Sequence, residues 1–135
     1  MGDCPSPAGP WLDKARQDLA AAERLLTEPA LPAPACFHAQ QAAEKALKAV
    51  AAHAGAQDIP RVHSLLEIAA IVQSLNQDVP FAADDLASLD PFAVQVRYPD
   101  LPEPGAEIAR QAVETAQAVC LWAAETISHT EVEEE

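Results

Sequence analysis

The chain has 135 residues, a length that fits a single domain able to bury a core without disulfides or structural metals. Half of its residues are apolar and only 4% are aromatic, a balance that favours packed helices over a β-sandwich. The formal net charge is −13, which argues against non-specific binding to duplex DNA, because such binding depends on Lys and Arg contacts with phosphates. A local basic pocket for one nucleotide or a short RNA is compatible with this charge.

The three cysteines, Cys4, Cys36 and Cys120, are scattered and form no C-x-x-C pair. We therefore expect neither a disulfide framework nor a zinc site, and we expect no cofactor. Cys36 and Cys120 fall in helical patterns and are expected to be small buried side chains. No secretory signal pattern precedes Trp11 and no apolar run is long enough to span a bilayer, so we expect a cytoplasmic protein without a membrane partner.

Residues 1–10 are rich in Pro, Gly and Ser and are expected to form a disordered leader. An apolar stripe with spacings of three and four predicts a first helix over 11–27, and prolines are expected to form a stiff connection after it. A second helix is predicted over 35–53, where a stripe of small residues indicates a central position in the bundle. The first stripe is Trp11, Ala15, Leu19, Ala22 and Leu26, the prolines are Pro29, Pro32 and Pro34, and the second stripe is Cys36, Ala39, Ala43, Leu47 and Val50.

Ser64 is predicted to cap a third helix, with Glu67 completing a capping box. One or two short helical turns are expected around Leu86, Leu89 and Phe92. The last long helix is predicted over 104–128, followed by an acidic tail over 129–135. Its inward-facing residues are expected to be Ile108, Ala112, Ala116, Val119, Ala123 and Ile127. No segment alternates like a strand, so the sequence predicts an all-α fold, an antiparallel up-and-down bundle of four to five helices over residues 11–128.

A polar stretch interrupts the second helix. Gln40 and Glu44 lie one turn apart, as do Gln41 and Lys45, and Glu44 is placed to form an i,i+4 ion pair with Lys48. The simplest interpretation of this spacing is a solvated helix face.

Two further polar stretches lie in connections. His63 stands beside the capping Ser64, where a histidine usually stabilises a turn through a hydrogen bond. Arg97 and Tyr98 precede the last helix, and they are residue types that clamp a phosphate and stack on a base or donate a hydrogen bond. The structural alternative for Arg97 is a salt bridge to an Asp or Glu that fixes the loop.

Together, these stretches resemble the HEPN family (higher eukaryotes and prokaryotes nucleotide-binding domain). The resemblance covers about 11–127, and it rests on the Trp11 helix, the segment 36–49, His63-Ser64-Leu65 and Arg97-Tyr98-Pro99. It implies a bundle of four or five helices that usually forms homodimers. It also implies, for small prokaryotic members, a minimal nucleotidyltransferase partner, in several cases as a toxin and antitoxin pair. Other members bind nucleotides. The most specific part is the second helix with Gln40, Gln41, Glu44, Lys45 and Lys48.

Ribonuclease members of the family place an Arg and a His, separated by four to six residues, at the dimer cleft. The corresponding window after Arg97 holds Pro102, Glu103 and Pro104, and no other Arg of the chain has a His at this spacing. Attack by the RNA 2′-hydroxyl needs a base that titrates near neutral pH, and His is the usual choice. Here His38 or His63 would have to supply that base from elsewhere in the fold.

We therefore expect a homodimeric binding or regulatory module, and not a self-sufficient ribonuclease. It would engage a nucleotide, a short RNA or a nucleotidyltransferase partner, as in toxin–antitoxin pairs. One alternative is a metal-independent ribonuclease toxin that uses Arg97 with a His from elsewhere, and another is a scaffold without a ligand. The predicted ligand-binding residues are Gln40, Gln41, Glu44, Lys45, Arg97 and Tyr98, with His38 and His63 as supporting residues.

Overall fold

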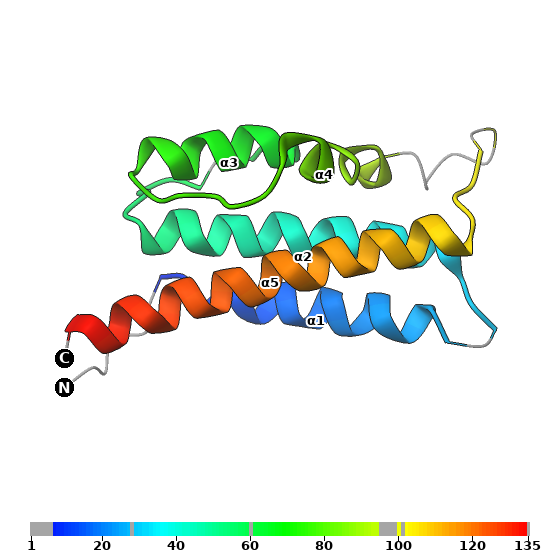
Figure 1. The fold of residues 1–135 in the computed structure, drawn as a ribbon, viewed down its shortest axis with the longest axis horizontal. Helices are drawn as coiled ribbons and strands as arrows, with labels where there is room; N and C mark the ends of the chain where they lie inside the picture. Colours follow the sequence, from blue (N-terminus) through cyan, green and yellow to red (C-terminus); the bar gives the residue numbers. More distant parts are fainter. Residues whose placement is uncertain (1–6, 28, 60, 95–99, 101, 135) are drawn as a thin grey trace.

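The computed structural model describes residues 7–27, 29–59, 61–94, 100 and 102–134, and this part of the chain contains helices and no strand. Helices α1 and α2, the α3–α4 segment and helix α5 alternate in direction along the bundle (Figure 1). The predicted antiparallel up-and-down helical bundle is therefore confirmed. The elements are α1 (Gly9–Leu25), α2 (Pro32–His53), α3 (Leu65–Ser74), α4 (Ala83–Ala87), the 3-10 helix η1 (Asp90–Ala93) and α5 (Ala106–Glu134). None of the described helices is both long and apolar enough to cross a membrane.

Helix α2 lies at the centre of the bundle, as its small residues predicted. It packs against α1 and α5 on one side and against α3 and η1 on the other (Figure 1). Small side chains let neighbouring helices approach closely from several directions, so burial extends around α2 and is not limited to one stripe. All residues of the predicted stripe are buried: Cys36, Ala39, Ala43, Leu47 and Val50.

The helix starts differ from the predicted ones. Helix α1 begins at Gly9, two residues before the predicted start, and the preceding Ala8 is fully buried. Helix α2 begins at Pro32, so Pro32 and Pro34 lie in its first turn and not in the predicted connection. The amide groups of a first turn have no partner within the helix, so a proline there removes no hydrogen bond.

Helix α5 differs from its prediction at both ends. It continues to Glu134, six residues beyond the predicted end at Ser128, because glutamate is a good helix former and an acidic run does not by itself end a helix. At the other end Ile108 is 49% exposed and Ala109 is buried in its place. The remaining predicted inward residues are buried: Ala112, Ala116, Val119, Ala123 and Ile127.

The turn before α3 is fixed from two sides. The Ser64 hydroxyl oxygen accepts a hydrogen bond from the Glu67 amide at 3.4 Å, which confirms the predicted N-cap. The Asp90 carboxylate, at the start of η1, accepts hydrogen bonds from the Leu65 amide at 2.9 Å and from the Ser64 hydroxyl at 3.2 Å. The predicted short turns are therefore α4 and η1, and η1 is hydrogen-bonded to the start of α3.

Candidate functional site

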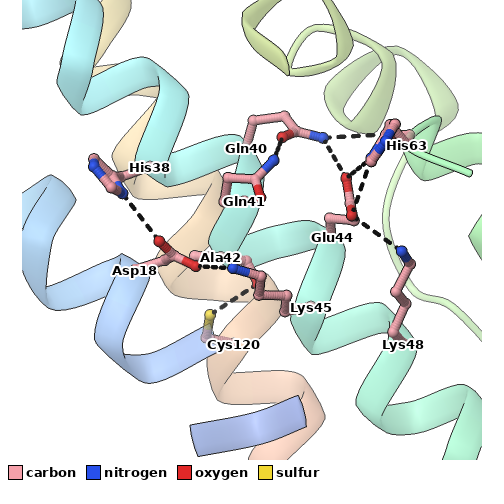
Figure 2. A network of polar contacts seen from close by, with 10 residues as sticks. All are labelled: Asp18, His38, Gln40, Gln41, Ala42, Glu44, Lys45, Lys48, His63 and Cys120. Atoms are coloured by element: carbon pink, nitrogen blue, oxygen red, sulfur yellow. Dashed lines mark hydrogen bonds and ion pairs between the residues drawn. The ribbon is translucent and has the colours of Figure 1, made fainter. Parts of the chain in front are cut away.

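The middle of α2 buries three polar side chains, Gln40, Glu44 and Lys48, together with its apolar surface. The interpretation of this stretch as a solvated helix face is therefore wrong. Lys48 Nζ donates to Glu44 Oε2 at 3.1 Å, and Gln40 Nε2 donates to Glu44 Oε1 at 3.1 Å (Figure 2). These partners lie one helical turn from Glu44, so the spacing predicted their contact although it did not predict their burial.

His63 completes this network from the loop before α3. Its Nδ1 lies 3.1 Å from Glu44 Oε1 and 3.3 Å from Oε2, and its backbone carbonyl accepts a hydrogen bond from Gln40 Nε2 at 3.2 Å. The His63 side chain is 69% exposed, whereas that of Glu44 is 4% exposed. The imidazole is thus anchored on a buried carboxylate and open to solvent. A neutral ring that donates from Nδ1 keeps an acceptor lone pair on Nε2.

Two neighbours complete the surroundings of this group. Gln41 Nε2 donates to Gln40 Oε1 at 2.7 Å, which fixes the orientation of the buried amide. Lys48 Nζ lies 5.5 Å from the centre of the Trp11 ring, within the range of a cation–π interaction. We call Gln40, Gln41, Glu44, Lys48 and His63 the Glu44 network. The Lys48 ammonium in this network is neutralised by Glu44 and lies over the Trp11 ring of α1.

Asp18 of α1 forms a second, separate cluster. Its carboxylate accepts a hydrogen bond from Lys45 Nζ at 2.6 Å and pairs with His38 Nδ1 at 2.9 Å. Figure 2 shows that this cluster lies on the α1 side of α2, away from His63. The predicted ligand-binding and supporting residues are thus divided: Lys45 and His38 tie α2 to α1, and the Glu44 network faces the loop before α3. Gln41, one turn before Lys45, bonds to Gln40 instead.

The other predicted site residues, Arg97 and Tyr98, lie outside the described residues. Sequence reasoning missed Asp18 and Asp90. Asp18 lies three residues after Ala15 and four before Ala22, both buried, and this spacing is the signal that could have indicated its place beside the inner face of α1. Asp90 accepts a hydrogen bond from the Leu65 amide, 25 residues earlier in the chain, and no local sequence pattern predicts such a contact.

Burial disfavours the thiolate form of Cys36 and Cys120. Desolvation raises the pKa of the Cys36 thiol to about 11 and that of Cys120 to about 12, so both stay protonated at neutral pH. This agrees with the predicted role of small buried side chains. Among the described residues, no three His, Cys, Asp or Glu side chains gather in a way that could hold a metal ion.

Comparisons with known proteins agree with this architecture. The family model of the HEPN domain matches residues 8–127. The crystal structure of TT1696 from Thermus thermophilus is similar with a TM-score of 0.72 and 30% identity, over 90% of this chain and 98% of that one. ST0689, an archaeal HEPN homologue, is similar with a TM-score of 0.62 and 25% identity, over 89% of this chain and 97% of that one. No curated protein matches the chain. With its family model matched over nearly the whole bundle, the chain belongs to the HEPN family.

Proposed function

We propose that this chain is a nucleotide-binding HEPN module that acts as a homodimer together with a minimal nucleotidyltransferase. Its ligand site is the exposed face of the Glu44 network, where His63 meets solvent. The observation that carries the proposal is the contrast within one hydrogen-bonded pair: a 69% exposed imidazole held 3.1 Å from a carboxylate that is 4% exposed.

The energetics of the Glu44 network favour a role beyond packing. Removing a carboxylate and an ammonium from water is costly, and their mutual attraction often fails to offset that cost. Leucine or methionine at positions 44 and 48 would fill the same space among the alanines of α2 at lower cost. The buried pair therefore adds little stability, but it gives His63 a fixed acceptor and a fixed orientation.

The chemistry of the exposed ring suits a phosphate or a base edge. With Nδ1 held by Glu44, Nε2 is the atom left to contact a ligand, either as an acceptor or, when the ring is protonated, as a donor. A charge-assisted hydrogen bond to a phosphate oxygen is about twice as strong as a neutral one. The fixed ring needs little further ordering on binding, which lowers the entropic cost of association.

Isothermal titration calorimetry with nucleoside monophosphates, nucleoside triphosphates and a short single-stranded RNA tests this proposal. His63→Ala should weaken binding by roughly 10-fold to 100-fold, the loss expected for one hydrogen bond to a charged group. His38→Ala is the matched control, because His38 also holds a carboxylate through Nδ1 but belongs to the Asp18 cluster. Equal affinity in all three proteins would place the ligand elsewhere, and no heat with the wild type would refute nucleotide binding.

The same pair supports a second candidate, a metal-independent ribonuclease. A carboxylate that orients a histidine through Nδ1 leaves Nε2 as a general base, which is the group that the Arg97 region lacks at the usual spacing. Cleavage of a fluorescent single-stranded RNA panel tests this candidate. Activity that is lost in both His63→Ala and Arg97→Ala would establish the nuclease, whereas no cleavage by folded wild type would leave the binding module.

The partner and the dimer need separate measurements. Light scattering coupled to size exclusion tests the homodimer, which a monomeric mass at micromolar concentration would contradict. Co-expression with a minimal nucleotidyltransferase tests the pairing, and a stable complex on gel filtration is the expected result. Growth arrest caused by this chain and relieved by that partner would support the toxin–antitoxin form of the proposal.

A further inference from the structure

A groove separates α4 and η1 from the first half of α5, on a surface that the Glu44 network does not reach. Its larger cavity has a volume of about 690 Å³, and a smaller one of about 290 Å³ adjoins it. Phe92 and Ile108 line both cavities, so the two form one continuous groove. The groove exists because α4 packs on α3 and η1 on α2, while α5 packs on α2 and α1.

The floor of the groove is apolar and includes an exposed isoleucine. Phe81, Phe92, Ile108 and Ala112 line it. Phe81 makes an edge-to-face contact with Trp122, with ring centres 5.6 Å apart. Ile108 is 49% exposed although its spacing predicted burial. An exposed isoleucine where the two cavities meet adds a large apolar side chain to this floor, and an apolar floor of this kind marks a surface that binds a partner.

The described charged residues that line this groove have one sign. Asp85 and Glu114 line the larger cavity and Glu103 lines the smaller one, and the described lining residues include no Lys or Arg. Arg110 of α5 pairs with Glu107 and lines neither cavity. An apolar floor whose described charged lining residues are all acidic is complementary to an apolar stripe flanked by basic residues.

We propose that this groove binds a basic amphipathic helix of a partner protein. The three walls are helices, and a helix seats its side chains between those of neighbouring helices. Apolar residues at positions i, i+3 or i+4, and i+7 would contact Phe81, Phe92 and Ile108. Lys or Arg residues beside that stripe would face Asp85 and Glu114. This surface is independent of the nucleotide site, so neither proposal depends on the other.

A second copy of the chain fits the groove less well. Two copies that met through this surface would bring the carboxylates of Asp85, Glu103 and Glu114 toward their counterparts, and like charges at an interface are costly. These charges favour a basic partner over self-association at this groove.

Fluorescence anisotropy with two synthetic helical peptides of about four turns tests the proposal. Both carry leucines at i, i+3, i+4 and i+7, and one is flanked by lysines and the other by glutamates. The lysine peptide should bind and the glutamate peptide should not. Ile108→Asp should weaken binding by about tenfold or more, as expected for an anchor at the centre of an interface. Leu121→Asp is the matched control, because Leu121 is 61% exposed on the same helix and does not line the groove.

Charge-reversal and blocking variants complete the test. The double variant Asp85→Lys/Glu114→Lys should lose the lysine peptide and gain the glutamate peptide. Ala118→Trp, at an exposed lining position, should block the groove by volume without disturbing the core. Three results would overturn the proposal: no binding of the lysine peptide by the wild type, binding unchanged by Ile108→Asp and Ala118→Trp, or a wild-type dimer that Ile108→Asp converts to a monomer.

Discussion

The Nδ1 atom of His63 lies 3.1 Å from Oε1 of Glu44, although one residue sits in an exposed loop and the other in the middle of the central helix. The contact fixes the imidazole on a carboxylate that water barely reaches. Lys48 neutralises that carboxylate from the next turn of α2, and Gln40 bonds to both partners of the pair. The central helix therefore supplies the support for the one exposed ring of this network.

Single substitutions in the buried ion pair should be strongly destabilising. Glu44→Ala removes the acceptor of three donors and leaves Lys48 as an uncompensated buried charge. We expect the free energy of unfolding to fall by about 3–5 kcal/mol, the usual cost of breaking a buried pair. Urea denaturation followed by circular dichroism measures it. A change below about 1 kcal/mol, the range of exposed pairs, would show that the pair is solvated in solution.

Asp18 should matter for stability and not for ligand binding. Asp18→Ala removes the partner of Lys45 and His38 between α1 and α2, and we expect a loss of about 1–3 kcal/mol. Nucleotide affinity should stay within experimental error of the wild type, because this cluster is separate from His63. Calorimetry and urea denaturation on the same preparation check both statements. A large loss of affinity with unchanged stability would move the site to the α1 side of α2.

Asp90 should hold the His63 turn in place. Asp90→Ala removes the acceptor of the Leu65 amide and of the Ser64 hydroxyl, and we expect a loss of about 1–3 kcal/mol. Asp90→Asn keeps one carbonyl oxygen for the amide and should recover most of that loss. Thermal denaturation of the wild type and the two variants measures the order of their stabilities. Equal melting temperatures for Asp90→Ala and the wild type would contradict this role.

The two buried thiols predict an alkaline loss of stability. Their pKa values are raised by burial from 9.0 to about 11 in Cys36 and to about 12 in Cys120. The neutral thiol is thus favoured in the folded state, so this contribution is complete below pH 9 and is lost as the pH rises through 11 and 12. The melting temperature of the wild type should fall more steeply above pH 9 than that of Cys36→Ala/Cys120→Ala.

A labelling experiment provides the control. In a Cys4→Ser background the two remaining thiols should resist Ellman's reagent at pH 8 and react once urea unfolds the protein. Rapid labelling of the native protein would show that one of them is accessible, and it would remove the basis of the alkaline prediction.

The sequence predicted the bundle because apolar periodicity, proline positions and the Ser64 cap are local signals. The small residues of α2 also indicated its central place. The sequence could not predict which polar residues are buried or which of them meet across the fold. The i,i+4 spacing predicted the contact between Glu44 and Lys48, but burial depends on which helices cover that face. The partner of Glu44 in the loop, His63, and the anchor of that loop, Asp90, are long-range contacts that only the fold defines.

The measurement that tests the central claim most directly is the double variant Glu44→Met/Lys48→Met, examined for both unfolding and nucleotide binding. If the buried pair serves to orient His63, the double variant should be as stable as the wild type or more stable, and it should lose nucleotide binding by about tenfold or more. A variant that binds nucleotides with wild-type affinity would contradict the account. So would one as unstable as Glu44→Ala, because the pair would then be a structural necessity.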